Sequence, residues 1–133
     1  MKKNKIIKVI ILILWMFVIF LLSNQTGSES TSLSDKVICS IFSNCNEDIY
    51  SLIVRKLAHF ILYFILGIFS YINFKDDKEG VINAILLCIL YAFTDEIHQM
   101  FIASRSGEVR DIIIDSLGSI SSILLIYKLK KRD

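Results

Sequence analysis

Four long apolar stretches are the feature of this 133-residue sequence that most restricts its fold. They occupy about residues 6–22, 55–74, 81–98 and 111–128, and residues 9–22 contain no charged or amide side chain. Because a helix rises 1.5 Å per residue, about 17–20 apolar residues cross the ~30 Å hydrocarbon core of a bilayer. The pattern predicts an all-α integral membrane protein with four transmembrane helices, forming a single domain over residues 1–133.

The composition excludes two other classes of protein. The chain is 54% hydrophobic and has no proline, which argues against a disordered chain. A soluble domain of this length buries only about two-thirds of its surface, too little to hide so much apolar area from water. The net charge of +2 is also too small for a nucleic-acid partner, since nucleic-acid binding requires a clustered basic face.

The first apolar stretch has two interpretations. Its basic start, with Lys2, Lys3 and Lys5, resembles the beginning of a cleavable signal peptide. The apolar run, however, is as long as or longer than a signal peptide core, and residues 22–27 offer no A-x-A-like cleavage site. We therefore predict a retained membrane anchor.

The basic residues predict the orientation of the helices. Ten of the fifteen Lys and Arg residues lie in the two tails and in the connection around residues 75–80. Cytoplasmic loops are enriched in these residues, so both termini are predicted to be cytoplasmic in a multi-pass protein of the cell membrane. Three of the four arginines fall instead on the predicted outer face, where a planar guanidinium can bind a carboxylate or a phosphate.

The segment between the first two spans is predicted to lie outside. Residues 23–35 are a polar, Ser/Thr-rich loop, and residues 34–42 have the spacing of a short amphipathic helix on the outer membrane surface. The second spanning helix should begin near Asp48. Cys39 and Cys45 enclose a turn on the oxidising side, but spacing alone does not decide whether they form a disulfide. Cys88 is expected to be a buried packing residue.

Polar side chains gather at one depth of the predicted bundle. Since successive spans alternate in direction, the start of the second span, the end of the third and the start of the fourth all lie just below the outer surface. Ionisable residues are rare in membrane helices and are functional candidates by default. The candidate ligand-binding residues are Arg55, Lys56, His59, Tyr63, Asp95, Glu96, His98, Gln99, Arg105, Arg110, Asp111 and Asp115.

The order and spacing of these residues resemble those of a known family. The resemblance is carried over nearly the whole chain by Ser23-Asn24-Gln25, Arg55-Lys56-x-x-His59-Phe60-x-x-Tyr63, Asp95-Glu96-x-His98-Gln99-x-Phe101-x-x-x-Arg105 and Asp111-x-x-x-Asp115-x-x-Gly118. On these motifs the chain resembles the VanZ-like membrane proteins, small multi-span bacterial proteins whose founding member lowers susceptibility to teicoplanin. The resemblance implies a role in the cell envelope and a functional set of Arg55, Lys56, His59, Asp95, Glu96, Gln99, Arg105 and Asp111.

Four positions depart from the family pattern. Asp115 stands where the family usually has Asn, Ala103-Ser104 where Pro-Gly is frequent, and Asn24 where a second serine is usual. The carboxylate of Asp115 adds a potential negative charge inside the membrane, so the family's role for this position does not transfer directly.

Two functional hypotheses follow from the polar residues. In the first, the arginines bind the phosphate of an outer-leaflet lipid, such as an undecaprenyl-linked envelope precursor or lipoteichoic acid, and the neighbouring polar groups bind its sugars or peptide. In the second, the chain is an enzyme that modifies such a lipid, with Asp95, Glu96, His59 and Asp111 as catalytic candidates. These carboxylates and the two histidines could also position a divalent ion, for which oxygen ligands favour Mg²⁺ or Mn²⁺. The metal signal is weak, because the histidines lie on different spans and no zincin-like motif is present, so we assign no metal ligands and no cofactor.

Two further interpretations remain open. The carboxylates could simply pair with arginines to hold the helices together. The carboxylates are those of Asp95, Glu96, Asp111 and Asp115, and the arginines are Arg55, Arg105 and Arg110. Asp115 and the small residues after it could instead line a transport pathway, although the cytoplasmic half of every span is almost uniformly apolar. The short helices leave room for a homo-oligomer, and no motif decides this.

Overall fold

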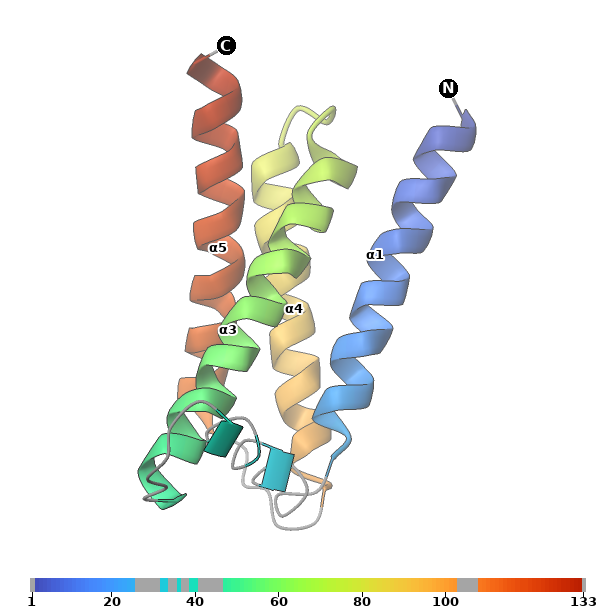
Figure 1. Cartoon of the computed structure of the whole chain (residues 1–133). Helices are drawn as coiled ribbons and strands as arrows, with labels where there is room; N and C mark the ends of the chain where they lie inside the picture. The colour runs from blue at the N-terminus through green and yellow to red at the C-terminus, as the bar shows by residue number, and fades with distance from the viewer. Residues whose placement is uncertain are drawn as a thin grey trace.

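The protein is a bundle of four antiparallel helices (Figure 1). The computed structural model describes residues 2–25, 32–33, 36, 39–40, 47–102 and 108–132, and no strand occurs among them. The helices are α1 (Lys2–Ser23), α3 (Glu47–Phe74), α4 (Gly80–Gln99) and α5 (Val109–Arg132). All four are long and apolar enough to cross a membrane, which confirms the predicted fold class.

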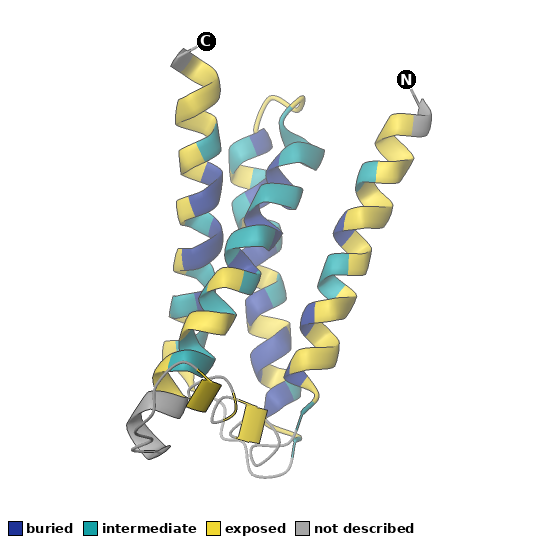
Figure 2. Cartoon of the chain, in the orientation of Figure 1, coloured by how far each residue is buried: buried dark blue, intermediate teal, exposed yellow. Residues whose placement is uncertain are grey.

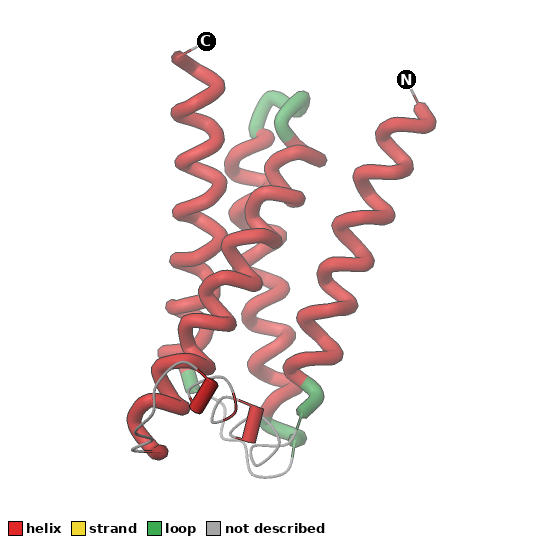
Figure 3. The backbone as a smooth tube through the Cα atoms, in the orientation of Figure 1, coloured by secondary structure: helices red, strands yellow, loops and turns green. Residues whose placement is uncertain are grey.

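The two ends of the bundle differ in what they contain. Both chain termini and the short α3–α4 turn lie at one end of the bundle. The last turns of α1 and α4 and the first turns of α3 and α5 lie at the other end (Figures 1 and 3). This arrangement agrees with an even number of crossings. Which end faces the cytoplasm stays a prediction from the distribution of basic residues, as does the retention of α1.

The connection between α1 and α3 is described only in part. Residues 32, 33, 36, 39 and 40 are helical and exposed, and the rest of the predicted surface helix lies outside the described residues. The next helix begins at Glu47, one residue before the predicted start. Cys39 is disulfide-bonded, Cys88 is buried and free, and Cys45 lies outside the described residues.

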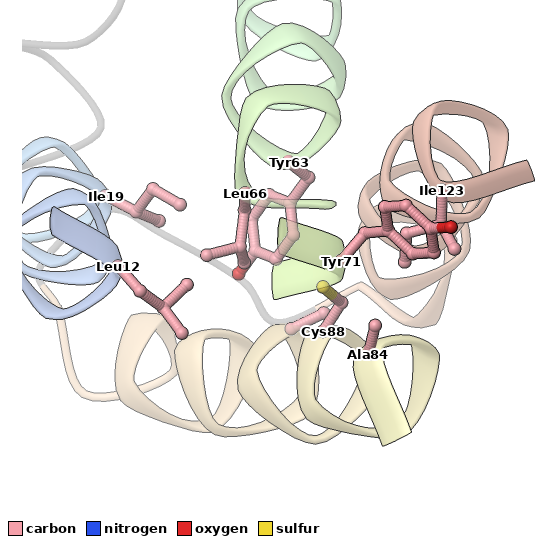
Figure 4. Close-up of a cluster of buried hydrophobic side chains, with 9 residues drawn as sticks. Leu12, Ile19, Tyr63, Leu66, Tyr71, Ala84, Cys88 and Ile123 are labelled. Atoms are coloured by element: carbon pink, nitrogen blue, oxygen red, sulfur yellow. The ribbon is translucent and has the colours of Figure 1, made fainter. Parts of the chain in front are cut away.

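Helix α3 is the centre of the bundle, because it packs against α1, α4 and α5. Buried side chains from all four helices meet around it, including Ile19, Leu66, Cys88 and Ile123 (Figure 4). Side-chain hydrogen bonds to backbone carbonyls add to this packing. The Trp15 indole of α1 donates to the carbonyl of Leu62 at 3.0 Å, which ties α1 to α3.

The closest helix contact lies between α3 and α5. A Cβ atom built on Gly118 would stand 2.5 Å from the carbonyl oxygen of Phe60, and one on Gly67 would stand 2.5 Å from that of Ser119. Only glycine allows the two backbones to come so close. The Ser122 hydroxyl donates to the Ser119 carbonyl of its own helix at 2.9 Å. The small residues that follow Asp115 therefore serve the packing of α5 against α3.

The outward faces of the helices are largely exposed and the faces towards the neighbouring helices are buried (Figure 2). The exposed residues include many large apolar side chains, and the buried ones include several polar side chains. Leu90, Phe17 and Leu117 are more than half exposed, while Asp95, Glu96 and Asp115 are at most 5% exposed. A water-soluble protein shows the opposite arrangement. The exposed apolar side chains are therefore suited to contact lipid, and the buried polar ones mark a functional candidate.

Candidate functional site

A buried group of polar side chains lies at the end of the bundle opposite to the chain termini. It comprises His59 and Tyr63 of α3, Asp95 and Gln99 of α4, and Asp115 of α5, and we call it the deep cluster. Its two carboxylates are almost completely buried, with exposed fractions of 4% for Asp95 and 2% for Asp115. The helical repeat places His59 and Tyr63 one turn apart on one face of α3 and likewise Asp95 and Gln99 on α4, so the predicted faces do point inward.

One oxygen of Asp95 is held by two hydrogen bonds. The Ser23 hydroxyl at the end of α1 donates to Oδ2 at 2.8 Å, and the Gln99 amide Nε2 donates to the same oxygen at 3.1 Å. The other oxygen, Oδ1, is buried and receives no hydrogen bond of ordinary length from a described residue. The carboxylate is thus fixed in orientation, with Oδ1 left available.

Asp115 faces His59 across the α3–α5 contact. The distance from His59 Nδ1 to Asp115 Oδ1 is 3.6 Å, beyond a normal hydrogen bond. The Tyr63 hydroxyl, which is also buried, is directed towards Asp95. The deep cluster therefore brings two carboxylates, an imidazole and a phenol together in a region shielded from solvent.

A second polar group lies nearer the end of the bundle and is partly exposed. This rim cluster comprises Lys56, Glu96, Glu108 and Asp111. Lys56 Nζ lies 2.8 Å from Asp111 Oδ1 and 3.6 Å from Glu108 Oε2. The backbone N–H of Glu108 donates to Glu96 Oε1, so the start of α5 is tied to the end of α4.

The predicted pairing of carboxylates with arginines is not found in the described part of the chain. The ion pairs there are made by Lys56 and His59, and neither Arg55 nor Arg110 makes an ion pair with a described carboxylate. Arg55 is half-buried and Arg110 is exposed. The prediction for Arg105 falls outside the described residues. The ion pair of Lys56 with Asp111 was not part of that interpretation.

His98 lies apart from the deep cluster. Its Nε2 is 3.2 Å from the Asn24 side-chain oxygen, and its ring lies 4.8 Å from that of Phe20, centroid to centroid. These contacts place it between α4 and α1, whereas Asp95 and Gln99 of the same helix belong to the deep cluster. The two histidines thus belong to different environments.

Two residues that contact these clusters were not among the predicted ligands. Ser23 ends the first span, and its hydroxyl binds Asp95, a role that its place in the Ser23-Asn24-Gln25 motif could have indicated. Glu108, which lies outside the sequence motifs, contacts Lys56 through its carboxylate and Glu96 through its backbone N–H. Neither contact follows from spacing, because each joins residues that are distant in sequence.

The chemistry of the deep cluster suits a cation or a proton. His59, Asp95 and Asp115 each offer one ligand atom, and the three atoms lie within 4.8 Å of one another. Two neighbouring buried carboxylates require a proton or a cation for neutralisation. The four predicted catalytic candidates are divided between the two clusters. His59 and Asp95 belong to the deep cluster, and Glu96 and Asp111 belong to the rim cluster.

Comparison with known proteins places the chain in a family. No curated protein and no solved structure matches the chain significantly. The model of one protein family, described as VanZ/LLP1, matches residues 8–130. This match includes the whole of α3 and α4, most of α1 and α5, and every residue of the deep and rim clusters, so the chain belongs to the VanZ/LLP1 family of proteins.

Proposed function

We propose that the protein binds the phosphate-bearing head group of an envelope lipid in the outer leaflet of the bacterial cell membrane, and thereby lowers susceptibility to lipoglycopeptide antibiotics such as teicoplanin. The lipid is an undecaprenyl-linked precursor or lipoteichoic acid. Support comes from family membership, from the four apolar helices and from the polar end of the bundle.

The state of the arginines is the observation that carries this proposal. Lys56 is bound by Asp111 and Glu108, whereas Arg55 and Arg110 make no ion pair with any described carboxylate. A guanidinium without a protein carboxylate can donate two parallel hydrogen bonds to a phosphate. Arg55 precedes Lys56 and Arg110 precedes Asp111 in the sequence, so both arginines belong to the first turns of their spans, at the depth where a lipid phosphate is found if this end of the bundle faces outward.

The antibiotic effect follows from where the lipid is bound. Teicoplanin carries an acyl chain that partitions into membranes. A protein that changes the display of outer-leaflet lipids can reduce its access to the surface without changing its peptide target. A glycopeptide with the same target but no acyl chain should then be affected less.

Lipid binding can be measured directly. The purified protein in nanodiscs is titrated with undecaprenyl phosphate, and with the uncharged alcohol as the reference ligand. We expect the Arg55→Gln, Arg110→Gln double variant to lose at least tenfold in affinity for the phosphate, because two charge-assisted contacts disappear. Lys130→Gln removes an exposed cation at the opposite end of the bundle and should bind normally. Equal affinity for the phosphate and the alcohol would contradict the proposal.

Susceptibility gives a second, cellular measurement. Expression in a teicoplanin-susceptible bacterium should raise the inhibitory concentration of teicoplanin, and the double arginine variant, expressed at the same level, should not. If both proteins give the same susceptibility as the empty vector, the link to antibiotic resistance is wrong, whereas the lipid-binding result still stands.

An alternative function is a membrane enzyme that modifies the same lipid. The specific observation in its favour is the 3.6 Å approach of His59 to Asp115 beside the buried Asp95, an arrangement suited to acid–base chemistry. Incubation with a radiolabelled lipid phosphate, followed by chromatography, should then show a product that His59→Ala abolishes. Binding without turnover would favour the first function.

A further inference from the structure

We propose that His59, Asp95 and Asp115 form a binding site for one divalent metal ion, Zn²⁺ or Mn²⁺, between the helices at the end of the bundle opposite to the chain termini. The site needs no bound lipid, so its test is independent of the head-group proposal. If the enzyme alternative holds, the ion is placed where it would act on that lipid.

The first argument is convergence. Three helices each contribute one ligand, and the three ligand atoms lie within 4.8 Å of one another. In a tetrahedral site with ligand bonds of about 2.1 Å, ligand atoms are separated by roughly 3.4 Å. The 3.6 Å between His59 Nδ1 and Asp115 Oδ1 already matches this separation. A side-chain rotation that moves a carboxylate oxygen of Asp95 by roughly 1 Å would bring this third ligand into range.

The second argument is the unsatisfied charge. Asp95 and Asp115 are almost fully buried, and Oδ1 of each receives no hydrogen bond of ordinary length within the described part of the chain. The nearby ammonium of Lys56 is already bound by Asp111. Buried carboxylates left in this state are costly, and a divalent cation between the two oxygens would satisfy both.

The third argument is the orientation of Asp95. Ser23 and Gln99 both donate to Oδ2, so the carboxylate cannot rotate freely and Oδ1 remains directed away from them. Hydrogen bonds that orient a ligand in this way are typical of metal sites. They come from α1 and α4, and the site therefore engages all four helices.

The ligand set selects the kind of metal. Two carboxylate oxygens and one imidazole nitrogen suit Zn²⁺ or Mn²⁺, whereas Mg²⁺ and Ca²⁺ prefer oxygen ligands alone. Three protein ligands leave a coordination position for water or for a ligand oxygen.

Metal content tests the site. Protein purified in detergent from cells supplied with zinc and manganese should contain close to one ion per chain by mass spectrometry. Asp95→Asn and Asp115→Asn each remove one ligand charge with little change in volume, and we expect at least a fivefold loss of bound metal. Asp111→Asn removes a carboxylate one turn before Asp115 but leaves all three ligands, and should retain the ion.

Cobalt and thermal stability provide a test that needs no variant. Co²⁺ added to metal-free wild-type protein should give visible absorption bands characteristic of bound cobalt, and Zn²⁺ or Mn²⁺ should raise the melting temperature. Helical circular dichroism and gel filtration show whether the variants are folded. Wild-type protein with no bound ion, no cobalt spectrum and no stabilisation would overturn the proposal. So would full metal content in both folded Asn variants.

Discussion

At the scale of single residues, Ser23 is the side chain through which α1 reaches the site. Its hydroxyl is 1% exposed and donates to Asp95 Oδ2 at 2.8 Å. Without this donor, a buried carboxylate oxygen would retain only the longer hydrogen bond from Gln99. The stability of the deep cluster therefore depends on a residue outside the three helices that form it.

The Ser23→Ala substitution tests this dependence. We expect a loss of about 1–2 kcal/mol in the free energy of unfolding, the usual cost of leaving a buried acceptor without its donor. The measurement is denaturant unfolding in detergent, followed by circular dichroism. Ser121→Ala removes a hydroxyl that is exposed and donates only to the Leu117 carbonyl of its own helix, and should change stability by a few tenths of a kcal/mol at most. Similar losses in the two variants would contradict the assigned role of Ser23.

At the scale of helices, the contact of α3 with α5 sets the position of the deep cluster. Gly118 lies one turn beyond Asp115, and its neighbour across the contact is the backbone of Phe60, next to His59. Lipid offers no hydrophobic drive to hold two helices together, so close packing of small residues must do so. The distance between His59 and Asp115 thus depends on the glycine.

Gly118→Ala should separate the two helices. The added methyl group would stand 2.5 Å from the Phe60 carbonyl oxygen, and we expect a loss of about 1–3 kcal/mol in stability from overpacking. Metal affinity should fall with it, because the ligands on α3 and α5 move apart. Ser121→Thr adds a methyl group to the exposed face of the same helix and serves as the control. Unchanged stability in Gly118→Ala would mean that the helices do not pack this closely in the membrane.

At the scale of the whole molecule, the arrangement of the ends has a testable consequence. The two termini and the α3–α4 turn share one end of the bundle (Figure 1). The basic residues are concentrated at this end, and the positive-inside rule assigns it to the cytoplasm. The deep and rim clusters then lie at the outer surface, as the proposed function requires.

Reporter fusions can check this orientation. A green fluorescent protein fused after residue 133 should fluoresce, and an alkaline phosphatase at the same place should be inactive, because the first folds in the cytoplasm and the second only outside. A phosphatase inserted within residues 76–78 should also be inactive. An active phosphatase at residue 133 would invert the topology and place the arginines on the wrong side for an outer-leaflet lipid.

The sequence by itself determined the four helices and the end of the bundle that carries the polar residues. Long apolar runs such as residues 9–22 have one stable arrangement in a bilayer, the helix, since the backbone must satisfy its own hydrogen bonds. The helical repeat then set which polar residues share a face, as His59 and Tyr63 do. Alternating directions brought these faces to a common depth.

Only the tertiary structure decided which of these residues meet. Asp111 and Asp115 share a face of α5, yet one binds Lys56 at the rim and the other is buried opposite His59. His98 turns towards Asn24, and Ser23 reaches Asp95 from another helix. The rotation and separation of helices depend on contacts such as that between Gly118 and Phe60. Contacts between distant parts of the chain leave no periodic pattern, and so spacing alone could not reveal the His59, Asp95 and Asp115 group.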